Sequence, residues 1–321
     1  MLNFVYWPIS WVLKFWHEAV GLVLDKSSGI SWILAIVLLT CTVRVFLLKP
    51  MVNQMRSMRK MQEMQPRMQE IREKYKNDQQ KMAAETQKLY KEMGTNPLAS
   101  CIVPLVQMPI FLGLFHVLRS FNRTASLGMS VEENRNTANY AFGPEDVQSF
   151  LDANFFGVPL SAYMSMPEQA YAAFTGVELT RPHIIAVCLP LVLICALFTH
   201  FNARMAIDRQ KSRRESGKVA APTGDTAKMM ESQMGMMNNM MLWFMPVMIL
   251  GSGFLWHIGL LFYMLTNNVW TFFQTRILYS KMDKEEEEEE ARKVELKRST
   301  APAPGARKVD KRSKKQRKQG K

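Results

Sequence analysis

The feature that most limits what this chain can fold into is a 20-residue apolar run at residues 31–50, which begins Ser-Trp-Ile-Leu and ends Leu-Leu-Lys-Pro. A helix of about 20 apolar residues is long enough to cross the hydrocarbon core of a bilayer. The run also contains Arg44, and an arginine at that depth costs roughly 2.5–3.5 kcal/mol on insertion scales. Such a charge usually faces a bundle interior or a water-filled cavity. We therefore expect a membrane protein in which Arg44 faces inward.

The alternative is that Arg44 snorkels. It lies five residues before Lys49, so about 7.5 Å of helix rise separates it from the end of the span. A long side chain at that depth reaches the headgroups. The general rule for intramembrane charges favours the inward-facing interpretation.

Four further apolar runs have the length of a membrane span: 97–119, 183–202, 240–256 and 259–279. The chain is 48% hydrophobic and 21% charged, and the two kinds of residue are segregated into separate segments. This pattern is typical of a multi-spanning membrane protein. The sequence predicts an all-α integral membrane protein with five transmembrane helices, the first at 31–50.

The connecting segments differ sharply in positive charge. The segment from Lys49 to residue 96 has 11 Lys and Arg, 203–239 has 7, and the tail from Arg276 has 16, whereas 1–30 and 120–180 have 2 each. By the positive-inside rule, we expect 51–96, 203–239 and the tail 280–321 to be cytoplasmic. The segments 1–30 and 120–182 are then extracytoplasmic, with the N-terminus outside and the C-terminus inside.

Residues 3–24 have the spacing of an amphipathic helix. Apolar residues including Ile9 and Leu13 share one side, and the polar residues Ser10, Lys14 and His17 are assigned to the other. Charged groups make a span costly, and the nearby tryptophans suit a headgroup interface. We expect a helix lying on the outer membrane surface. The alternative is a short span that tolerates Lys14.

Residues 51–96 are predicted to form a cytoplasmic helical hairpin with arms at 51–75 and 79–93. Asp78 can cap the second arm, and Gly94 can end it. Methionines at helical spacing form an apolar stripe on the first arm: Met55, Met58, Met61, Met64 and Met68. Methionine surfaces adapt to varied partners. The stripe therefore suits either the packing of one arm on the other or the docking of apolar guests, and the two uses are compatible.

Catalytic and metal-binding motifs are missing from the sequence. There is no phosphate-binding loop, no His-Glu-x-x-His and no nucleophile elbow. The four cysteines fall in apolar runs without metal-ligand spacing, which indicates packing roles. We expect no enzyme activity, no cofactor and no metal.

Uncharged polar residues recur within the predicted spans: Thr40, Thr42, Gln107, Asn267, Asn268 and Gln274. Such groups seek partners inside the bundle. Each alone suits hydrogen bonding between neighbouring helices. The set taken with Arg44 favours a hydrophilic groove that opens to the cytoplasm. A small-molecule or ion transporter would also explain these residues, but no inverted repeat is visible.

A series of motifs resembles the YidC/Oxa/Alb membrane insertase family, in family order. The matching stretches are Thr42-Val-Arg44 with Lys49-Pro50, the hairpin from Gln54 to Asp78, Asn96-Pro97-Leu98, Pro104-Leu-Val-Gln107-Met-Pro109, Phe244-Met-Pro246, and Tyr263 with Asn267-Asn268 and Gln274. The length and the charged tail are similar to those of members from high-GC Gram-positive bacteria.

The resemblance implies a bacterial plasma-membrane insertase and chaperone that needs no nucleotide. It implies nascent membrane proteins as guests, the Sec translocon as a partner, and the methionine stripe as a docking surface. It also implies ribosome contact through the tail 307–321, which has nine Lys or Arg in 15 residues. The electrostatics of that tail suit RNA phosphate or anionic lipid equally.

Overall fold

The protein is described by a computed structural model that covers residues 3–95, 99–174, 176–217 and 226–300. The chain divides into two compact units, Met1–Phe273 and Gln274–Lys321. Both are helical in their described parts, apart from one two-stranded sheet in the first unit. The predicted basic tail 307–321 lies outside the described residues.

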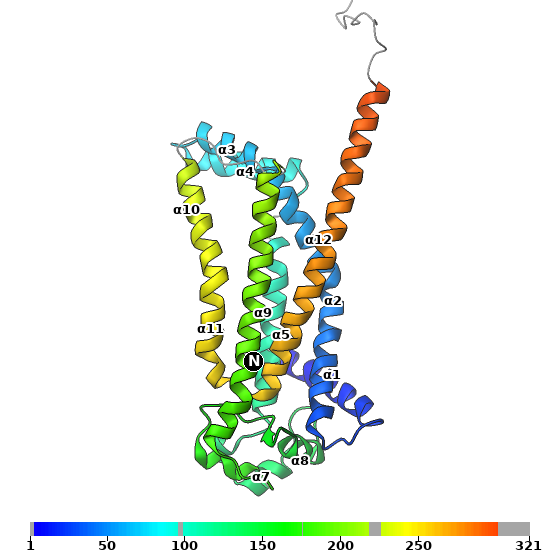
Figure 1. Cartoon of the computed structure of the whole chain (residues 1–321), viewed down its shortest axis with the longest axis vertical. Coiled ribbons are helices and arrows are strands. Elements are labelled where there is room, and N and C mark those ends of the chain that lie inside the picture. Colours follow the sequence, from blue (N-terminus) through cyan, green and yellow to red (C-terminus); the bar gives the residue numbers. More distant parts are fainter. Residues whose placement is uncertain (1–2, 96–98, 175, 218–225, 301–321) are drawn as a thin grey trace, which may run out of the picture. The chain divides into compact units, whose positions relative to one another are not determined.

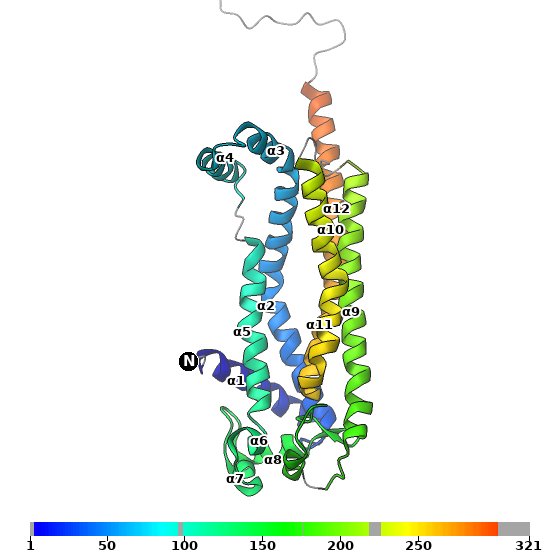
Figure 2. The same cartoon turned by 90° about the vertical axis from the view of Figure 1, so that its left-hand side faces the viewer.

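Long helices form the body of the first unit (Figures 1 and 2). Their bounds are α1 Asn3–Val20, α2 Gly29–Glu63, α3 Gln65–Lys74, α4 Gln79–Glu92, α5 Ala99–Arg119, α9 Arg181–Glu215, α10 Thr226–Asn239 and α11 Met245–Ser252. Helix α12, Ile258–Thr300, begins in the first unit and continues into the second. Helices α1, α2 and α5 pack together, and α11 packs along α9.

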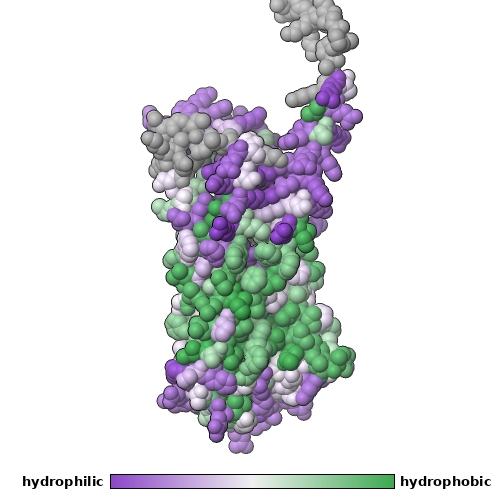
Figure 3. All heavy atoms as spheres, in the orientation of Figure 1, coloured by the Kyte–Doolittle hydropathy of each residue, from purple (hydrophilic) through white to green (hydrophobic). Residues whose placement is uncertain are grey.

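Among the residues that the structure describes, three helical stretches are long and apolar enough to cross a membrane: Gly29–Glu63, Arg181–Glu215 and Ser232–Leu255. They contain the predicted first, third and fourth spans. The predicted second span falls in α5, and the predicted fifth lies within α12. Figure 3 shows apolar atoms along the middle of α9 and α11 on this face and hydrophilic atoms below them. This is the surface of an integral membrane protein.

The predicted first arm of the hairpin, 51–75, is not one helix. Helix α2 runs without a break through Pro50 to Glu63, and α3 begins at Gln65 with Pro66 in its first turn. Pro66 lacks a backbone N–H, so it suits the first turn of α3, whereas Pro50 is tolerated in the interior of α2. The hairpin arms are therefore α3 and α4. The Asp78 cap was predicted correctly, since its carboxylate accepts the Lys81 N–H at 3.0 Å.

Helix α11 is preceded by a π-helical turn, η2 Met240–Phe244, which the sequence did not indicate. Pro246 follows it and has no N–H to bond the Leu242 carbonyl four residues earlier. His200 of α9 donates to that carbonyl through Nδ1 at 2.9 Å. The π-turn is thus fixed to α9 by the residue that satisfies its free acceptor.

Residues 120–182, which were expected as an extracytoplasmic loop, form a compact cap in their described part. The cap contains α6 Thr124–Leu127, α7 Val131–Asn136, α8 Pro144–Asp152, the antiparallel strands β1 Asn154–Phe155 and β2 Val158–Pro159, and the 3₁₀ helix η1 Glu168–Ala173. Its core surrounds Trp32, which is fully buried against the rings of Phe121, Phe142 and Phe150 at centroid distances of 4.9–5.8 Å.

The cap also covers one side of α1. The assignment of Ser10 and His17 to a solvent-facing side of this helix was wrong, because both are buried. His17 stacks on Trp32 at 3.6 Å and donates through Nε2 to the Lys26 carbonyl at 3.0 Å. Burial lowers the pKa of His17. Lys14 pairs with Asp146 of α8 at 2.9 Å, so the cap also supplies the partner of this charged side chain.

Candidate functional site

Arg44 of α2 is the centre of a polar cluster inside the first unit. Its side chain is only 7% exposed. The guanidinium donates to α12 three times: Nε to Asn267 Oδ1 at 2.7 Å, Nη2 to Thr271 Oγ1 at 2.9 Å, and Nη2 to the Asn267 carbonyl at 3.4 Å. These bonds fix Arg44 against a neighbouring helix, which differs from the snorkelling arrangement. Nη1 donates to none of the described residues.

Gln107 of α5 reaches the same face of α12. Its Nε2 donates to the Tyr263 hydroxyl at 2.5 Å, and Tyr263 is 2% exposed. Tyr263, Asn267 and Thr271 are spaced four residues apart, so they share one side of the helix. One stripe of α12 therefore receives polar side chains from both α2 and α5.

Asn268 faces a different neighbour. Its Oδ1 accepts from Thr199 Oγ1 of α9 at 3.0 Å, and its backbone carbonyl accepts from Asn202 Nδ2 at 3.1 Å. These contacts join α9 to α12 by hydrogen bonds of polar side chains, an interaction typical of membrane bundles. Asn268 thus takes part in the packing of α9 on α12, on a side of α12 adjacent to the one that carries Asn267.

Thr40 and Thr42 make hydrogen bonds to groups other than Arg44. Thr40 Oγ1 donates back to the Ile36 carbonyl at 2.7 Å. Thr42 Oγ1 donates to the Leu38 carbonyl at 2.8 Å and accepts from Trp16 Nε1 of α1 at 2.9 Å. Gln274 is the first residue of the second unit. Of the predicted set, Arg44 and Asn267 meet directly, and Gln107 joins them through Tyr263.

Sequence reasoning did not include Thr271, Thr199 or Asn202 among the candidates. Thr271 had a detectable signal, because it lies four residues after Asn267 and so shares its helix face. Thr199 and Asn202 had only the general signal of uncharged polar residues inside the predicted span 183–202, and their partner Asn268 is more than 60 residues away in sequence. Helix pairing across that separation is not encoded in local spacing.

The predicted methionine stripe is divided by the helix break at Met64. Met55, Met58 and Met61 lie on the end of α2, Met68 lies on α3, and Met64 at the junction is 1% exposed. Met58 is the most exposed of the five at 44%. A cavity of about 490 Å³ lies between the two hairpin arms and is lined by Met68, Arg72, Met82, Ala83, Thr86, Gln87 and Tyr90.

Groups that could hold a metal ion are absent from the described part of the chain, where no three His, Cys, Asp or Glu side chains converge. Cys188 and Cys195 are buried free thiols in α9. The polar cluster offers fixed hydrogen-bond donors and one positive charge. Such an arrangement is chemically suited to anionic or polar groups within an apolar bundle.

Comparison with known proteins adds a family to this arrangement. The sequence model of the family described as "60Kd inner membrane protein" matches residues 23–286. The chain is 41% identical over 310 residues to "Membrane protein insertase YidC" of Mycobacterium tuberculosis H37Rv, covering 95% of this chain and 80% of that protein. The protein of the same name from Mycobacterium leprae is 39% identical over 95% of this chain and 77% of its own length. That from Streptomyces avermitilis is 30% identical over 85% of this chain and 57% of its own length.

Proposed function

The chain belongs to the 60Kd inner membrane protein family, and from this membership we propose that it is a membrane protein insertase. The observation that carries the proposal is the 39–41% identity to proteins named membrane protein insertase over 95% of the chain. The chain is a multi-pass protein of the bacterial membrane. No comparison favours a small-molecule transporter, and insertion needs no covalent step.

We propose five spans with the N-terminus outside and the C-terminus in the cytoplasm. The strong excess of Lys and Arg in 49–96, 203–239 and the tail supports this orientation. Helix α1 then lies on the outer surface. Its exposed side carries Phe4, Trp7, Trp11 and Phe15 at helical spacing, and such an aromatic stripe suits the headgroup level.

The polar cluster around Arg44 is proposed to line a groove that is open to the cytoplasm. Moving an apolar helix of about 20 residues into lipid is favourable by itself. The obstacle is the polar flank of the guest, which must cross hydrocarbon at a cost of several kcal/mol per unsatisfied group. A groove that reaches partway through the membrane shortens that crossing.

Arg44 would hold an acidic flank of the guest through a charge-assisted hydrogen bond. Such bonds are about twice as strong as neutral ones. Nη1 is suited to this contact, because Nε and Nη2 are already bonded to Asn267 and Thr271. A membrane potential that is positive outside would then favour outward transfer of the negative flank by about 2.3 kcal/mol per charge per 100 mV.

The hairpin is proposed as the first docking surface for apolar guest segments. Support comes from the exposed Met58 on the end of α2 and from the cavity between the arms, where Met68 and Met82 lie. Thioether side chains can repack around different apolar partners.

The proposed partners are nascent membrane proteins as guests and the Sec translocon beside which the chain acts. The ribosome is proposed as a partner of the basic tail 307–321. The nine positive charges of that tail would make such a contact strongly salt-dependent.

The proposal is tested with purified protein in sealed liposomes. A single-span guest with an acidic outer flank is added without nucleotide, and insertion is read as protease protection. Protection that requires the protein, and that falls in Arg44→Ala, is the expected result. Protection that is equal in Arg44→Ala would remove Arg44 from the mechanism, and protection that is no greater than in empty liposomes would contradict autonomous insertion.

A further inference from the structure

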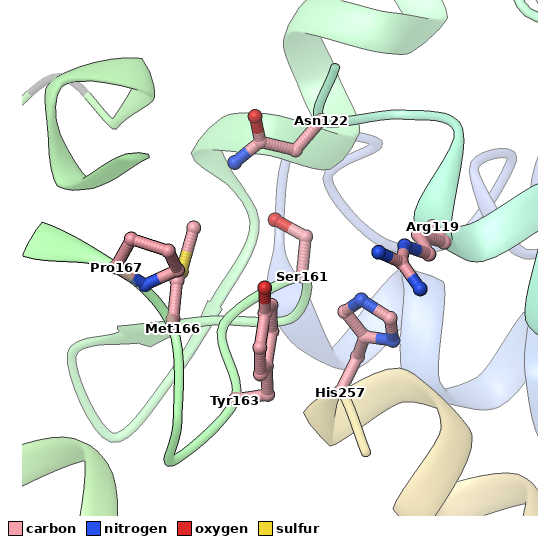
Figure 4. Close-up of a pocket in the computed structure, with 7 residues that line it drawn as sticks. All are labelled: Arg119, Asn122, Ser161, Tyr163, Met166, Pro167 and His257. Carbon is pink, nitrogen blue, oxygen red and sulfur yellow. The ribbon is translucent and has the colours of Figure 1, made fainter. Parts of the chain in front are cut away.

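A second polar site lies in the extracytoplasmic cap of the first unit, away from Arg44. A cavity of about 180 Å³ lies where the end of α5, the segment after strand β2 and the turn before α12 meet. Figure 4 shows its polar side chains pointing toward a shared space: Arg119, Asn122, Ser161, Tyr163 and His257. None of these residues takes part in the proposed insertion mechanism.

Three of these side chains have buried polar atoms without a protein partner. They are Asn122 Nδ2, Ser161 Oγ and His257 Nδ1. Ser161 is 2% exposed and His257 is 4% exposed. A buried polar group without a hydrogen bond costs about 1–3 kcal/mol, so three in one cavity indicate that something else satisfies them.

The orientation of Asn122 is fixed by its neighbour. Its Oδ1 accepts from the Thr124 hydroxyl at 2.7 Å and from the Thr124 N–H at 3.3 Å. The amide nitrogen is therefore the atom that faces the cavity, and it can only donate. The Ser161 hydroxyl can also donate, as can one ring nitrogen of a neutral His257.

The charge around the cavity is positive. Arg119 lines it and makes no salt bridge with any described residue, and no carboxylate is among the lining groups. Arg181 lies beside it, since its Nη2 donates to the carbonyl of the lining residue Met166 at 3.3 Å. Burial and the Arg119 charge lower the pKa of His257 to about 3, so its ring is neutral at pH 7. The Arg119 guanidinium lies over the Phe115 ring at 6.0 Å, and no described carboxylate neutralises it. A cluster of donors beside such a charge is suited to an oxyanion.

We propose that this cavity binds a phosphate group, through Arg119 and the donors of Asn122, Ser161 and His257. Arg119 ends the apolar helix α5 and is exposed, so the site is accessible at the boundary between the apolar spans and the cap. That boundary is the depth of lipid headgroups. The phosphate can therefore come from a phospholipid of the outer leaflet or from free phosphate, and both offer the same acceptor oxygens.

The test uses the purified full chain, delipidated in a neutral detergent. One arm titrates water-soluble dihexanoyl phosphatidylglycerol and follows 1:1 complexes by native mass spectrometry. The other arm titrates inorganic phosphate by calorimetry. The variants are Arg119→Gln, which removes the charge, and Ser161→Ala, which removes one donor with little change in volume. Arg204→Gln is the matched control, because Arg204 is exposed and pairs only at 3.6 Å with exposed Asp208 on α9.

Saturable 1:1 binding that weakens about tenfold or more in both cavity variants, but not in Arg204→Gln, is the expected result. Tighter binding of the lipid than of inorganic phosphate assigns the site to a headgroup, and equal binding assigns it to free phosphate. Absence of saturable binding of either probe would overturn the proposal, because ordered water then satisfies the donors. Equal weakening in Arg119→Gln and Arg204→Gln would overturn it too, since the effect is then one of net charge. Thermal unfolding of each variant verifies that it is folded.

Discussion

Replacing Arg44 with glutamine should slow the insertion of guests according to the charge of their flank. The proposed role of Arg44 is electrostatic, whereas its bonds to Asn267 and Thr271 are structural. Arg44→Gln removes both. For a guest with an acidic flank, the variant removes both the electrostatic attraction and the structural support of the site. For a guest whose flank carries Asn in place of Asp, it removes only the structural support. The ratio between the two guests therefore isolates the electrostatic part.

The size of the effect follows from the burial of Arg44, which is 7% exposed. Two unit charges 4 Å apart attract by about 4 kcal/mol at an effective dielectric constant of 20 and by about 1 kcal/mol in bulk water. The difference of about 3 kcal/mol corresponds to about 100-fold. We expect Arg44→Gln to reduce insertion of the acidic guest by about that factor relative to the neutral guest.

The assay is the initial rate of protease protection in sealed liposomes, measured for both guests with wild type and variant. Thr271→Val is the control, because it removes one acceptor of the guanidinium and keeps the charge. It should change both guests equally and by a few-fold at most. An Arg44→Gln variant that impairs both guests to the same extent would refute the electrostatic role and leave Arg44 as a link between α2 and α12.

Three further predictions concern other parts of the chain. Replacing Gln65–Met93 with a Gly-Ser linker should leave the thermal unfolding midpoint nearly unchanged, because α3 and α4 pack chiefly on each other, but should abolish insertion; full insertion would exclude the docking role. Gly29→Ala should lower the thermal unfolding midpoint, since a Cβ there would lie 1.8 Å from the Asn154 carbonyl oxygen. Gly251→Ala should leave the midpoint unchanged, because a Cβ at that position has no atom within 4 Å. Because the pKa of buried His257 is lowered to about 3, the unfolded chain binds a proton at this residue below pH 6.5 and the folded protein does not. The free energy of unfolding should therefore be lower at pH 5.5 than at pH 7.5 by about 1.4 kcal/mol. Thermal unfolding at pH 7.5 and 5.5 should show a smaller decrease in stability for His257→Gln than for the wild type. An equal decrease in the two proteins would contradict this prediction.

The parts of the fold that sequence predicted well depend on local signals. Runs of about 20 apolar residues identify spans through bilayer thickness alone. The Asp78 cap could also be predicted from the sequence, because the Asp78 carboxylate and the free N–H that it accepts from are only three residues apart. The continuation of α2 through Pro50 to Glu63 was not predicted, because the change from apolar to charged residues after Lys49 looks like the end of a helix. Such a change indicates where a helix passes from lipid to water, and the helix itself can continue.

The cap illustrates what local patterns miss. Its segments are short and rich in polar residues, which is also how an open loop looks. Its stability comes from distant partners such as Trp32, which packs on Phe150 and bonds Ser149 Oγ at 3.0 Å across 117 positions of sequence. The same distant packing buries His17 on what looked like the polar side of α1. Periodicity gives the sides of a helix but not which side another element will cover.

The polar cluster around Arg44 was predicted in its components but not in the way that they pair. Arg44 was identified because a charge in an apolar run is costly wherever the run folds. Its partner Asn267 is 223 positions away, and nothing in the sequence distinguished it from the other polar residues of the predicted spans. Only the packing of α12 against α2 brings Asn267 to Arg44. Thr40 and Thr42 flank Arg44 in sequence, but they satisfy their own hydroxyls on α2 and on Trp16. Nearness in sequence to a functional residue therefore does not imply a shared site.

The hydrogen bonds of Arg44 suit the transient contact proposed for it. A guanidinium has five N–H donors, and the bonds to Asn267 and Thr271 use the one on Nε and the two on Nη2. If all five were satisfied within the protein, no donor would remain for a guest. If none were, burial of the charge would cost several kcal/mol in the empty insertase. Partial satisfaction lowers that cost while the two donors on Nη1 remain for an acidic flank. The proposed mechanism requires this balance, because the guest must bind strongly enough to leave water and weakly enough to be released into lipid.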